Sequence, residues 1–262
     1  MRSSPIGVFD SGSGGLSIWQ AVHAVLPAES LVYIGDHANI PYGGKSTEFI
    51  RERVVQSIEF LIKKNCKLIV IACNTATIAG IDYVRAKFPQ IPIVGVVPVI
   101  KTAASISTTK HFVVLSTQFT TKSLYQKDLI KKWANDCTVI NVGSSLLVPL
   151  IEDGQVDGEN IEKELRRVFA PFQNEPYDVI ALGCTHYPFI RGAITKVLGD
   201  RAQIIDSSGA IVRQVVRILD SRNDRSDHFE RELFFTTGDT KKVGGVFKKI
   251  LGRFVEIGYV TL

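Results

Sequence analysis

The feature that most constrains the fold is a pair of apolar runs that each end in a cysteine. Residues 68–72 read LIVIA and precede Cys73, and residues 179–183 read VIALG and precede Cys184. Short apolar runs of this kind are typical of the buried strands of parallel sheets. Small polar residues follow both cysteines. We therefore expect each thiol at the carboxyl end of a strand, which is the edge where open parallel sheets bind ligands.

The rest of the chain repeats this pattern in two halves. Apolar strands alternate with amphipathic helical stretches, and the cysteine falls in the third strand unit of each half. The predicted strands cover residues 5–9, 31–34, 68–72 and 93–97 in the first half, and 111–115, 138–142, 179–183 and 202–205 in the second. The repeat predicts an α/β fold of two pseudo-symmetric domains, with mainly parallel sheets that face each other across a central cleft.

The segment after residue 208 is expected to return to the first domain. It predicts a helix at 211–220, a strand at 233–237, a helix at 242–251 and a final strand at 254–260. The predicted domains are therefore residues 1–98 plus 208–262, on the Cys73 side, and residues 99–207, on the Cys184 side.

Composition excludes several broad classes of protein. The chain has 262 residues, of which 45% are hydrophobic and 22% charged, as in an ordinary globular protein. No apolar run reaches the length of a membrane span and no signal-peptide core follows Met1, so a cytoplasmic location is expected. The net charge is +5. The basic residues are scattered and form no nucleic-acid motif, so solvated helix faces are favoured, with attraction of an anionic substrate as a further role.

Two loops carry glycine and polar residues after predicted strands. The DSGSGG stretch at 10–15 would let backbone N–H groups approach an anion at a helix start. A dinucleotide fingerprint fits poorly because Asp10 would stand where a pyrophosphate binds, and a tight structural turn is the plain alternative. The loop at 36–46 ends in GGKS but lacks the first glycine of a phosphate loop. It is equally consistent with a binding loop and an ordinary one.

The four cysteines do not make a disulfide framework in a chain of this length. Cys73 begins the sequence CNT and Cys184 begins CTH, so both have polar neighbours. A nearby imidazole can lower the pKa of a thiol from about 8.5. Cys66 and Cys137 precede strands without polar company and are predicted to be packing residues. No C-x-x-C pair occurs, so zinc is not favoured.

Two further residues have both a plain and a functional interpretation. His186 would be a satisfied core histidine if it stood alone, but its place beside Cys184 favours a role in the site. Glu152 follows the apolar stretch 146–151. It could simply end a helix that Gly154 caps.

Five motifs in order resemble those of the bacterial glutamate racemases, within the aspartate/glutamate racemase superfamily. They are GVFDSGSGGL (7–16), YIGD (33–36), PYG (41–43), ACNTA (72–76) and GCTHYP (183–188). Together they extend from about residue 6 to the turn at 206–207. Ser13 departs from the more apolar residue that is usual in the family.

The resemblance implies cofactor-independent interconversion of L-glutamate and D-glutamate, which supplies D-glutamate for peptidoglycan synthesis. It implies no metal and no nucleic-acid or membrane partner. A homodimer and a cell-wall-precursor activator are candidate partners that the sequence itself does not decide. Carried over by position, the catalytic residues are Cys73, Cys184, Asp10, His186 and, on a looser motif, Glu152. The substrate contacts are Asp10, Ser11, Tyr42, Gly43, Asn74, Thr75, Thr185 and His186.

The chemistry of the residues agrees with this expectation. The α-proton of glutamate is a very weak acid, and no lysine lies in a pyridoxal-phosphate motif that would supply an electron sink. Preorganised donors in a dry site must then stabilise the developing carbanion. One thiolate would remove the proton while the opposite thiol delivers another, and the roles would swap in the reverse direction. We expect His186 to tune Cys184 and Asp10 to assist Cys73.

Three alternatives remain open at this point. A cysteine hydrolase needs one nucleophile, a base and an oxyanion hole, which leaves the second thiol unexplained. A two-lobed binding protein explains the repeat but not the thiols. An aspartate racemase would differ in pocket length, which the sequence does not give.

Overall fold

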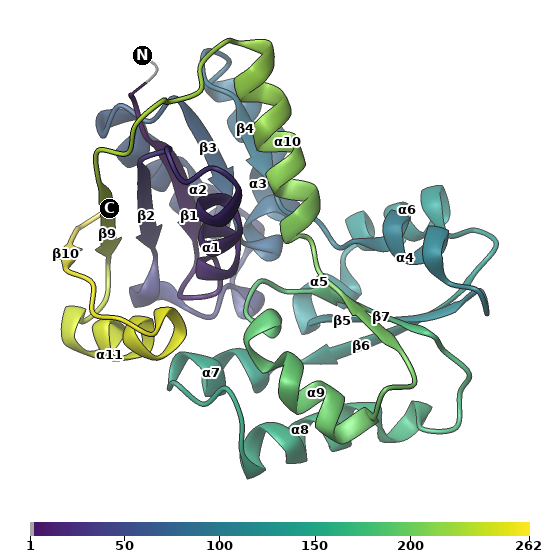
Figure 1. Ribbon diagram of the computed structural model, residues 1–262. Helices are drawn as coiled ribbons and strands as arrows, with labels where there is room; N and C mark the ends of the chain where they lie inside the picture. Colours follow the sequence, from purple (N-terminus) through teal and green to yellow (C-terminus); the bar gives the residue numbers. More distant parts are fainter. Residues whose placement is uncertain (1–2) are drawn as a thin grey trace. The chain divides into compact units, whose positions relative to one another are not determined.

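The structure is a computed structural model in which residues 3–262 are described. The chain divides into two compact units. The first unit runs to Val96 and includes Ser208–Leu262, and the second is Val97–Ser207. Each unit contains a sheet of parallel strands covered by helices, which confirms the predicted α/β class (Figure 1). Among residues 3–262, no helix has the length and apolar character needed to cross a membrane.

The first unit has a six-stranded sheet with the order β10-β9-β2-β1-β3-β4. The residues of β1, β2 and β3 are all buried, because helices cover both faces of the sheet and the strands carry apolar side chains on both. The C-terminal segment adds β9 beside β2 and β10 beside β9. The strands are β1 (Ile6–Asp10), β2 (Leu31–Gly35), β3 (Leu68–Ile71), β4 (Ile93–Gly95), β9 (Glu232–Thr236) and β10 (Ile257–Tyr259).

The second unit has a four-stranded sheet with the order β6-β5-β7-β8. This order repeats β2-β1-β3-β4 of the first unit, because in each the first strand lies between the second and the third. The strand-for-strand repeat that the sequence predicts is thus present in the fold, and β3 and β7 hold equivalent places. The strands are β5 (His111–Thr117), β6 (Thr138–Ser144), β7 (Val179–Gly183) and β8 (Gln203–Ile205).

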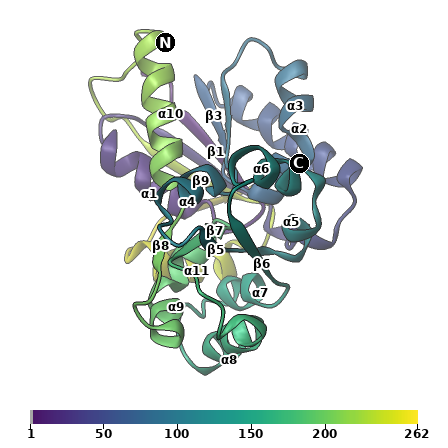
Figure 2. The same ribbon diagram turned by 90° about the vertical axis from the view of Figure 1, so that its right-hand side faces the viewer.

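Four helices of the first unit form two pairs on opposite faces of its sheet. Helix α1 packs on α10, and α2 packs on α3. The two views agree on this arrangement (Figures 1 and 2). Capping residues set several helix starts: the Ser46 hydroxyl accepts a hydrogen bond from Phe49 N, and the Asp239 carboxylate accepts two. The elements are α1 (Leu16–Val25), η1 (His37–Asn39), η2 (Tyr42–Gly44), α2 (Thr47–Lys63), α3 (Asn74–Lys87), α10 (Ser208–Ser221) and α11 (Thr240–Leu251).

The helices of the second unit also cover both faces of its sheet. Ile100 and Ala103 of α4 join a buried cluster with Phe112 and Val179 of the sheet. Helices α8 and α9 pack together on the other face, below the strands in Figure 2. The elements are α4 (Ile100–Ile106), α5 (Gln118–Lys122), α6 (Leu124–Trp133), α7 (Leu147–Glu152), α8 (Glu159–Phe169), η3 (Ala170–Phe172), η4 (Tyr187–Ile190) and α9 (Arg191–Leu198).

Most strand boundaries differ by one or two residues from the sequence prediction, and two of the differences have clear physical reasons. Strand β1 continues through Asp10, because its carbonyl accepts a hydrogen bond from Asp36 N at 3.0 Å and so extends the ladder with β2. Strand β10 is shorter than the predicted 254–260, because it lies at the sheet edge and pairs over three residues only. The first change matters for function, since it holds the Asp10 backbone inside the sheet.

Candidate active site

Cys73 lies at the carboxyl edge of the first sheet, two residues beyond β3. Its backbone is extended, and its side chain caps α3 by accepting a hydrogen bond from Ala76 N at 3.4 Å. The residue is only 7% exposed. The start of a helix carries a partial positive charge, which favours a thiolate over a thiol. The cap therefore supplies a physical reason for Cys73 to ionise.

The turn after β1 brings a hydroxyl to this thiol. The Ser11 Oγ lies 3.4 Å from the Cys73 Sγ, and both residues are buried. The Asp10 carboxylate accepts a hydrogen bond from Gly12 N at 2.7 Å. A side chain at Gly15 would put its Cβ 2.7 Å from the Asp10 Cβ, so the turn requires glycine there. These contacts fix Asp10 and Ser11 in a tightly packed turn.

Ser13, the residue that departs from the family pattern, has a specific partner. Its Oγ lies 3.0 Å from His37 Nε2, while His37 Nδ1 lies 2.8 Å from the Thr236 hydroxyl. Ser13 is fully buried, so an unpaired hydroxyl there would be costly. The hydrogen bond explains how this polar residue is accommodated, and it ties the glycine-rich turn to β9.

Tyr42 is held by a carboxylate that the sequence analysis did not single out. Its hydroxyl donates to Asp36 Oδ2 at 2.7 Å, and its side chain is buried. Burial, together with the Asp36 charge, raises the pKa of Tyr42 well above its usual value. Tyr42 is therefore a neutral hydrogen-bond donor over the physiological range. Asp36 follows β2 at the same sheet edge as Cys73.

Asp36 is itself fixed by donors from distant parts of the chain. Arg53 of α2 donates to both carboxylate oxygens, at 2.8 and 2.9 Å, and the Thr237 hydroxyl donates at 2.7 Å. Burial alone would raise the pKa of Asp36, but these donors outweigh it and lower the pKa. The polar break after the predicted strand at 31–34 was a signal for this residue, yet nothing local in the sequence pointed to Arg53 or Thr237.

Asn74 presents an unusual buried amide beside Cys73. The residue is 4% exposed, and neither its Nδ2 nor its Oδ1 has a hydrogen-bond partner among residues 3–262. Leaving such a group unpaired costs about 1–3 kcal/mol. A polar ligand would relieve that cost. Two more predicted substrate contacts belong to the same unit: the buried Thr75 follows Asn74 in the first turn of α3, and Gly43 lies in η2.

In the second unit the structure brings together three of the predicted catalytic residues. The Cys184 Sγ lies 3.7 Å from His186 Nδ1, and His186 Nε2 lies 2.6 Å from Glu152 Oε1. Cys184 follows β7, just as Cys73 lies beyond β3. Thr185, a predicted substrate contact, lies between Cys184 and His186 in the sequence and is also buried. The result is a chain of thiol, imidazole and carboxylate groups.

The contacts of His186 determine its charge. Burial by itself would lower the pKa of His186, but the hydrogen bonds and charges of Cys184 and Glu152 outweigh it and raise the pKa well above the usual value. An imidazolium held by Glu152 can donate its Nδ1 proton toward Cys184. This arrangement places a histidine with a raised pKa beside the Cys184 sulfur.

Glu152 both ends a helix and contacts a residue of the candidate site, which are the two interpretations of its sequence. It is the last residue of α7, and Gly154 follows with a positive φ of 78°, as expected of a residue that ends a helix. Its carboxylate also reaches His186. The helix end therefore serves to position a carboxylate in the site.

The other two cysteines have different surroundings. Cys66 is buried, and burial raises the pKa of its thiol to about 12. Cys137 is partly exposed and donates to Asp136 Oδ1 at 3.5 Å, so the expectation that it lacks polar company is wrong. Its pKa is raised by partial burial and by Asp136. Within residues 3–262, no three His, Cys, Asp or Glu side chains are grouped to hold a metal ion.

Comparisons with known proteins show the family to which the chain belongs. The family model described as Asp/Glu/Hydantoin racemase matches residues 6–215. The glutamate racemase of Pseudomonas paraeruginosa is 40% identical over 221 residues, which cover 84% of this chain and 83% of that protein.

Solved structures of the same name superpose over nearly the whole chain. Glutamate racemase RacE1 from Bacillus anthracis has a TM-score of 0.91 at 30% identity, covering 100% of this chain and 99% of that one. The Escherichia coli glutamate racemase in complex with L-glutamate and the activator UDP-MurNAc-Ala has a TM-score of 0.88 at 32% identity, covering 98% of both chains. The chain belongs to the Asp/Glu/Hydantoin racemase family.

Proposed function

We propose that this amino-acid racemase interconverts L- and D-glutamate without a cofactor, using Cys73 and Cys184 as the two acid/base groups. The observation that carries the proposal is that equivalent strands, β3 and β7, each lead into a buried cysteine with polar groups on its sulfur. A single nucleophile would leave one of these matched thiols without a role. Proton removal and proton delivery at one carbon give a role to both.

Glutamate is the favoured substrate because the relatives at 36–40% identity are named glutamate racemases. The aspartate racemase structures are more distant, at 17–18% identity, and support the shared fold alone. Assaying both amino acids separates the two substrates. The Asn74 amide and the Ser11 hydroxyl are groups that can donate to a substrate carboxylate, and the Tyr42 hydroxyl, whose proton goes to Asp36, can accept from the ammonium group.

On the Cys73 side, the proposed base is a thiolate at the start of α3. Helix N–H groups stabilise the ionised sulfur, and the Ser11 hydroxyl offers a further hydrogen bond. When Cys73 takes the α-proton, the carbanion is stabilised by preorganised donors rather than by water. The assistance of Asp10 to Cys73, which the sequence predicts, is part of the same proposal.

On the Cys184 side, the proposed base works with His186 and Glu152. The imidazolium stabilises the thiolate, and Glu152 stabilises the imidazolium. When Cys184 instead acts as the acid, it gives its proton to the carbanion and becomes the thiolate that this pair stabilises. Each direction of the reaction therefore begins with one thiolate and ends with the other.

The wider role follows from the same family membership. We propose a cytoplasmic enzyme that supplies D-glutamate for peptidoglycan, with UDP-MurNAc-Ala as the compound to test for activation, since the E. coli structure contains it. A homodimer is also part of this proposal, to be checked by the mass of the protein in solution.

The experiment that tests the function follows the circular dichroism of L-glutamate, D-glutamate and both enantiomers of aspartate. The protein is first dialysed against a chelator. We expect either form of glutamate to approach the racemic mixture, aspartate to react far more slowly, and added zinc or pyridoxal phosphate to have no effect. Activity that returns only with zinc or pyridoxal phosphate would overturn the cofactor-independent mechanism.

A further inference from the structure

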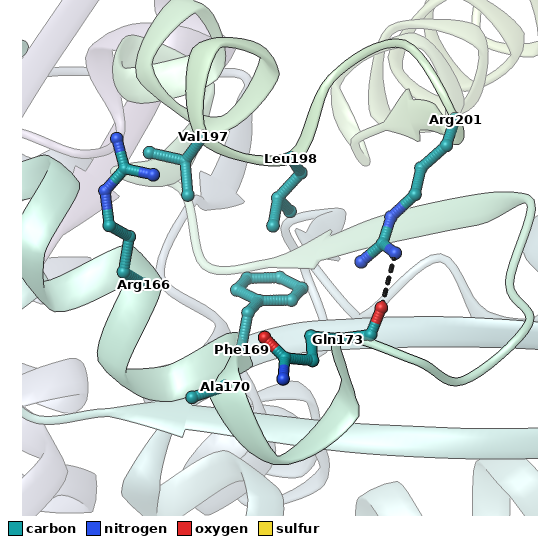
Figure 3. A pocket seen from close by; sticks show the side chains of 7 residues that line it. All are labelled: Arg166, Phe169, Ala170, Gln173, Val197, Leu198 and Arg201. Carbon is teal, nitrogen blue, oxygen red and sulfur yellow. Dashed lines mark hydrogen bonds between the residues drawn. The ribbon is translucent and has the colours of Figure 1, made fainter.

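A pocket of about 400 Å³ lies in the second unit, away from the residues described above. It is formed by the end of α8, by η3 and the residues after it, and by the end of α9 (Figure 3). Arg166 and Arg201 lie on either side of it, and Phe169, Val197 and Leu198 supply apolar surface between them. This size is within the range of sites for small ligands.

Arg201 is an exposed residue whose guanidinium group is hydrogen-bonded and stacked on an aromatic ring. Its Nη1 donates to the Gln173 carbonyl at 2.8 Å, its Nη2 donates to the Tyr177 hydroxyl, and its guanidinium carbon lies 4.3 Å from the Tyr177 ring centroid. Burial raises the pKa of Tyr177 in spite of Arg201, so the hydroxyl is neutral. No carboxylate among the described residues forms an ion pair with Arg201. A guanidinium group that these contacts orient toward the pocket can pair with an oxyanion there.

The charges around Arg166 add to this positive field. Arg166 Nη2 lies 3.4 Å from Glu162 Oε2, but the same carboxylate also accepts from Lys196 Nζ at 2.5 Å. Two cations therefore share one carboxylate. Arg166 stands in the last turn of α8, where the helix dipole favours a cation even without a ligand. Arg201 lies outside both helices, so that explanation does not extend to it.

The pocket lies at the opposite edge of the sheet from Cys184. Arg201 comes two residues before β8, and Gln173 comes before β7, whose first residue Val179 pairs with the first residue of β8. Cys184 follows the last residue of β7. Five strand residues span about 17 Å. A small ligand in the pocket therefore does not touch the thiol.

We propose that this pocket binds a small organic anion in which a carboxylate or phosphate group is joined to a flat apolar body. The anionic group pairs with the guanidinium group of Arg201, and Arg166 on the other side of the pocket adds to the positive field. The apolar body packs against Phe169, Val197 and Leu198. The proposal does not depend on the racemase mechanism, because the pocket and the thiols share no residue.

The test titrates the full-length protein with phenyl phosphate and with 3-phenylpropionate, followed by calorimetry and by amide NMR shifts. Inorganic phosphate lacks the apolar body, and benzyl alcohol lacks the charge. We expect at least one aromatic anion to bind with a Kd of about 1 mM and both controls to bind at least about tenfold more weakly. The stronger of the two aromatic anions identifies phosphate or carboxylate as the preferred group.

Variants separate the pocket from general charge attraction. Arg201→Met should weaken binding about tenfold or more, and Arg201→Lys should weaken it less, since it keeps the charge but loses the planar fork. Lys163→Met is the matched control, because Lys163 is an exposed cation of α8 that does not line the pocket. Circular dichroism checks that each variant is folded. Equal binding of benzyl alcohol, an unchanged Kd in Arg201→Met, or displacement of the probe by glutamate would overturn the proposal.

Discussion

Cys73 and Cys184 follow equivalent strands, yet the groups that contact their sulfur atoms differ. Cys73 accepts from the start of a helix and lies beside the Ser11 hydroxyl. Cys184 lies beside His186, which is paired with Glu152. The repeated fold therefore places the two thiols at equivalent positions, while the groups around each sulfur differ. One sulfur lies beside neutral donors at the start of a helix, and the other lies beside a histidine whose pKa is raised.

The largest expected effect is the loss of either thiol. Cys73→Ala and Cys184→Ala should each lower kcat for racemisation by about 100-fold to 10,000-fold, because each removes a general acid/base group. Circular dichroism of glutamate measures this loss in both directions. Cys137→Ala should keep almost full activity. Wild-type rates in Cys73→Ala would contradict a role for both units.

Glu152→Gln should cause a smaller loss of activity. The cause should be a change in the surroundings of Cys184 alone. The variant removes a charge that raises the pKa of His186, so that pKa should fall. The imidazolium is then lost at lower pH, and the basic limb of the kcat/KM profile should move to lower pH. The activity at neutral pH should drop about tenfold or more. A matched change, Glu162→Gln, alters an exposed ion pair of α8 and should leave the pH profile in place.

Asp36→Asn should weaken the residue that holds Tyr42 without changing Cys73 itself. The folded pKa of Asp36 is lower than its usual value, so its ionisation stabilises the fold above about pH 4 and this stability is lost as the pH falls through the folded pKa. The variant should lower Tm at pH 7 and show a smaller further loss between pH 4 and pH 2. Glutamate KM should rise as the Tyr42 hydroxyl loses its charged acceptor. Thermal unfolding across pH measures the first effect, and a steeper acid loss than in the wild type would contradict it.

The smallest expected effect is that of Ser11→Ala, which removes one neutral hydrogen bond from Cys73. Such a bond contributes about 0.5–1.5 kcal/mol, so kcat/KM should fall about twofold to twelvefold. The basic limb of the pH profile, which we assign to His186, should not move. A shift like that of Glu152→Gln would remove the distinction between the two cysteine surroundings.

The parts of the molecule that sequence could predict are those with local signals. The strands that lead to both cysteines are short apolar runs that break into polar residues, and they lie where the pattern predicted them. His186 is two residues from Cys184, so its contact could also be anticipated.

Other contacts have no local signal. Thr237 and Asp36 are 201 residues apart in the chain, and their hydrogen bond depends on β9 pairing with β2. The pair of Glu152 and His186 depends on where α7 ends in space. The short β10 depends on its edge position, which the run of residues 254–260 does not reveal.

The most direct test of the two-thiol account is α-proton exchange in deuterated water by the single cysteine variants. Each variant keeps one thiol, which can still remove the α-proton of one enantiomer and return deuterium to the same face. Proton NMR follows the α-signal of L-glutamate and D-glutamate separately. We predict that Cys73→Ala exchanges one enantiomer without inverting it and that Cys184→Ala exchanges the other. Exchange of the same enantiomer by both variants, or of both enantiomers equally by each, would contradict the assignment of one thiol to each direction.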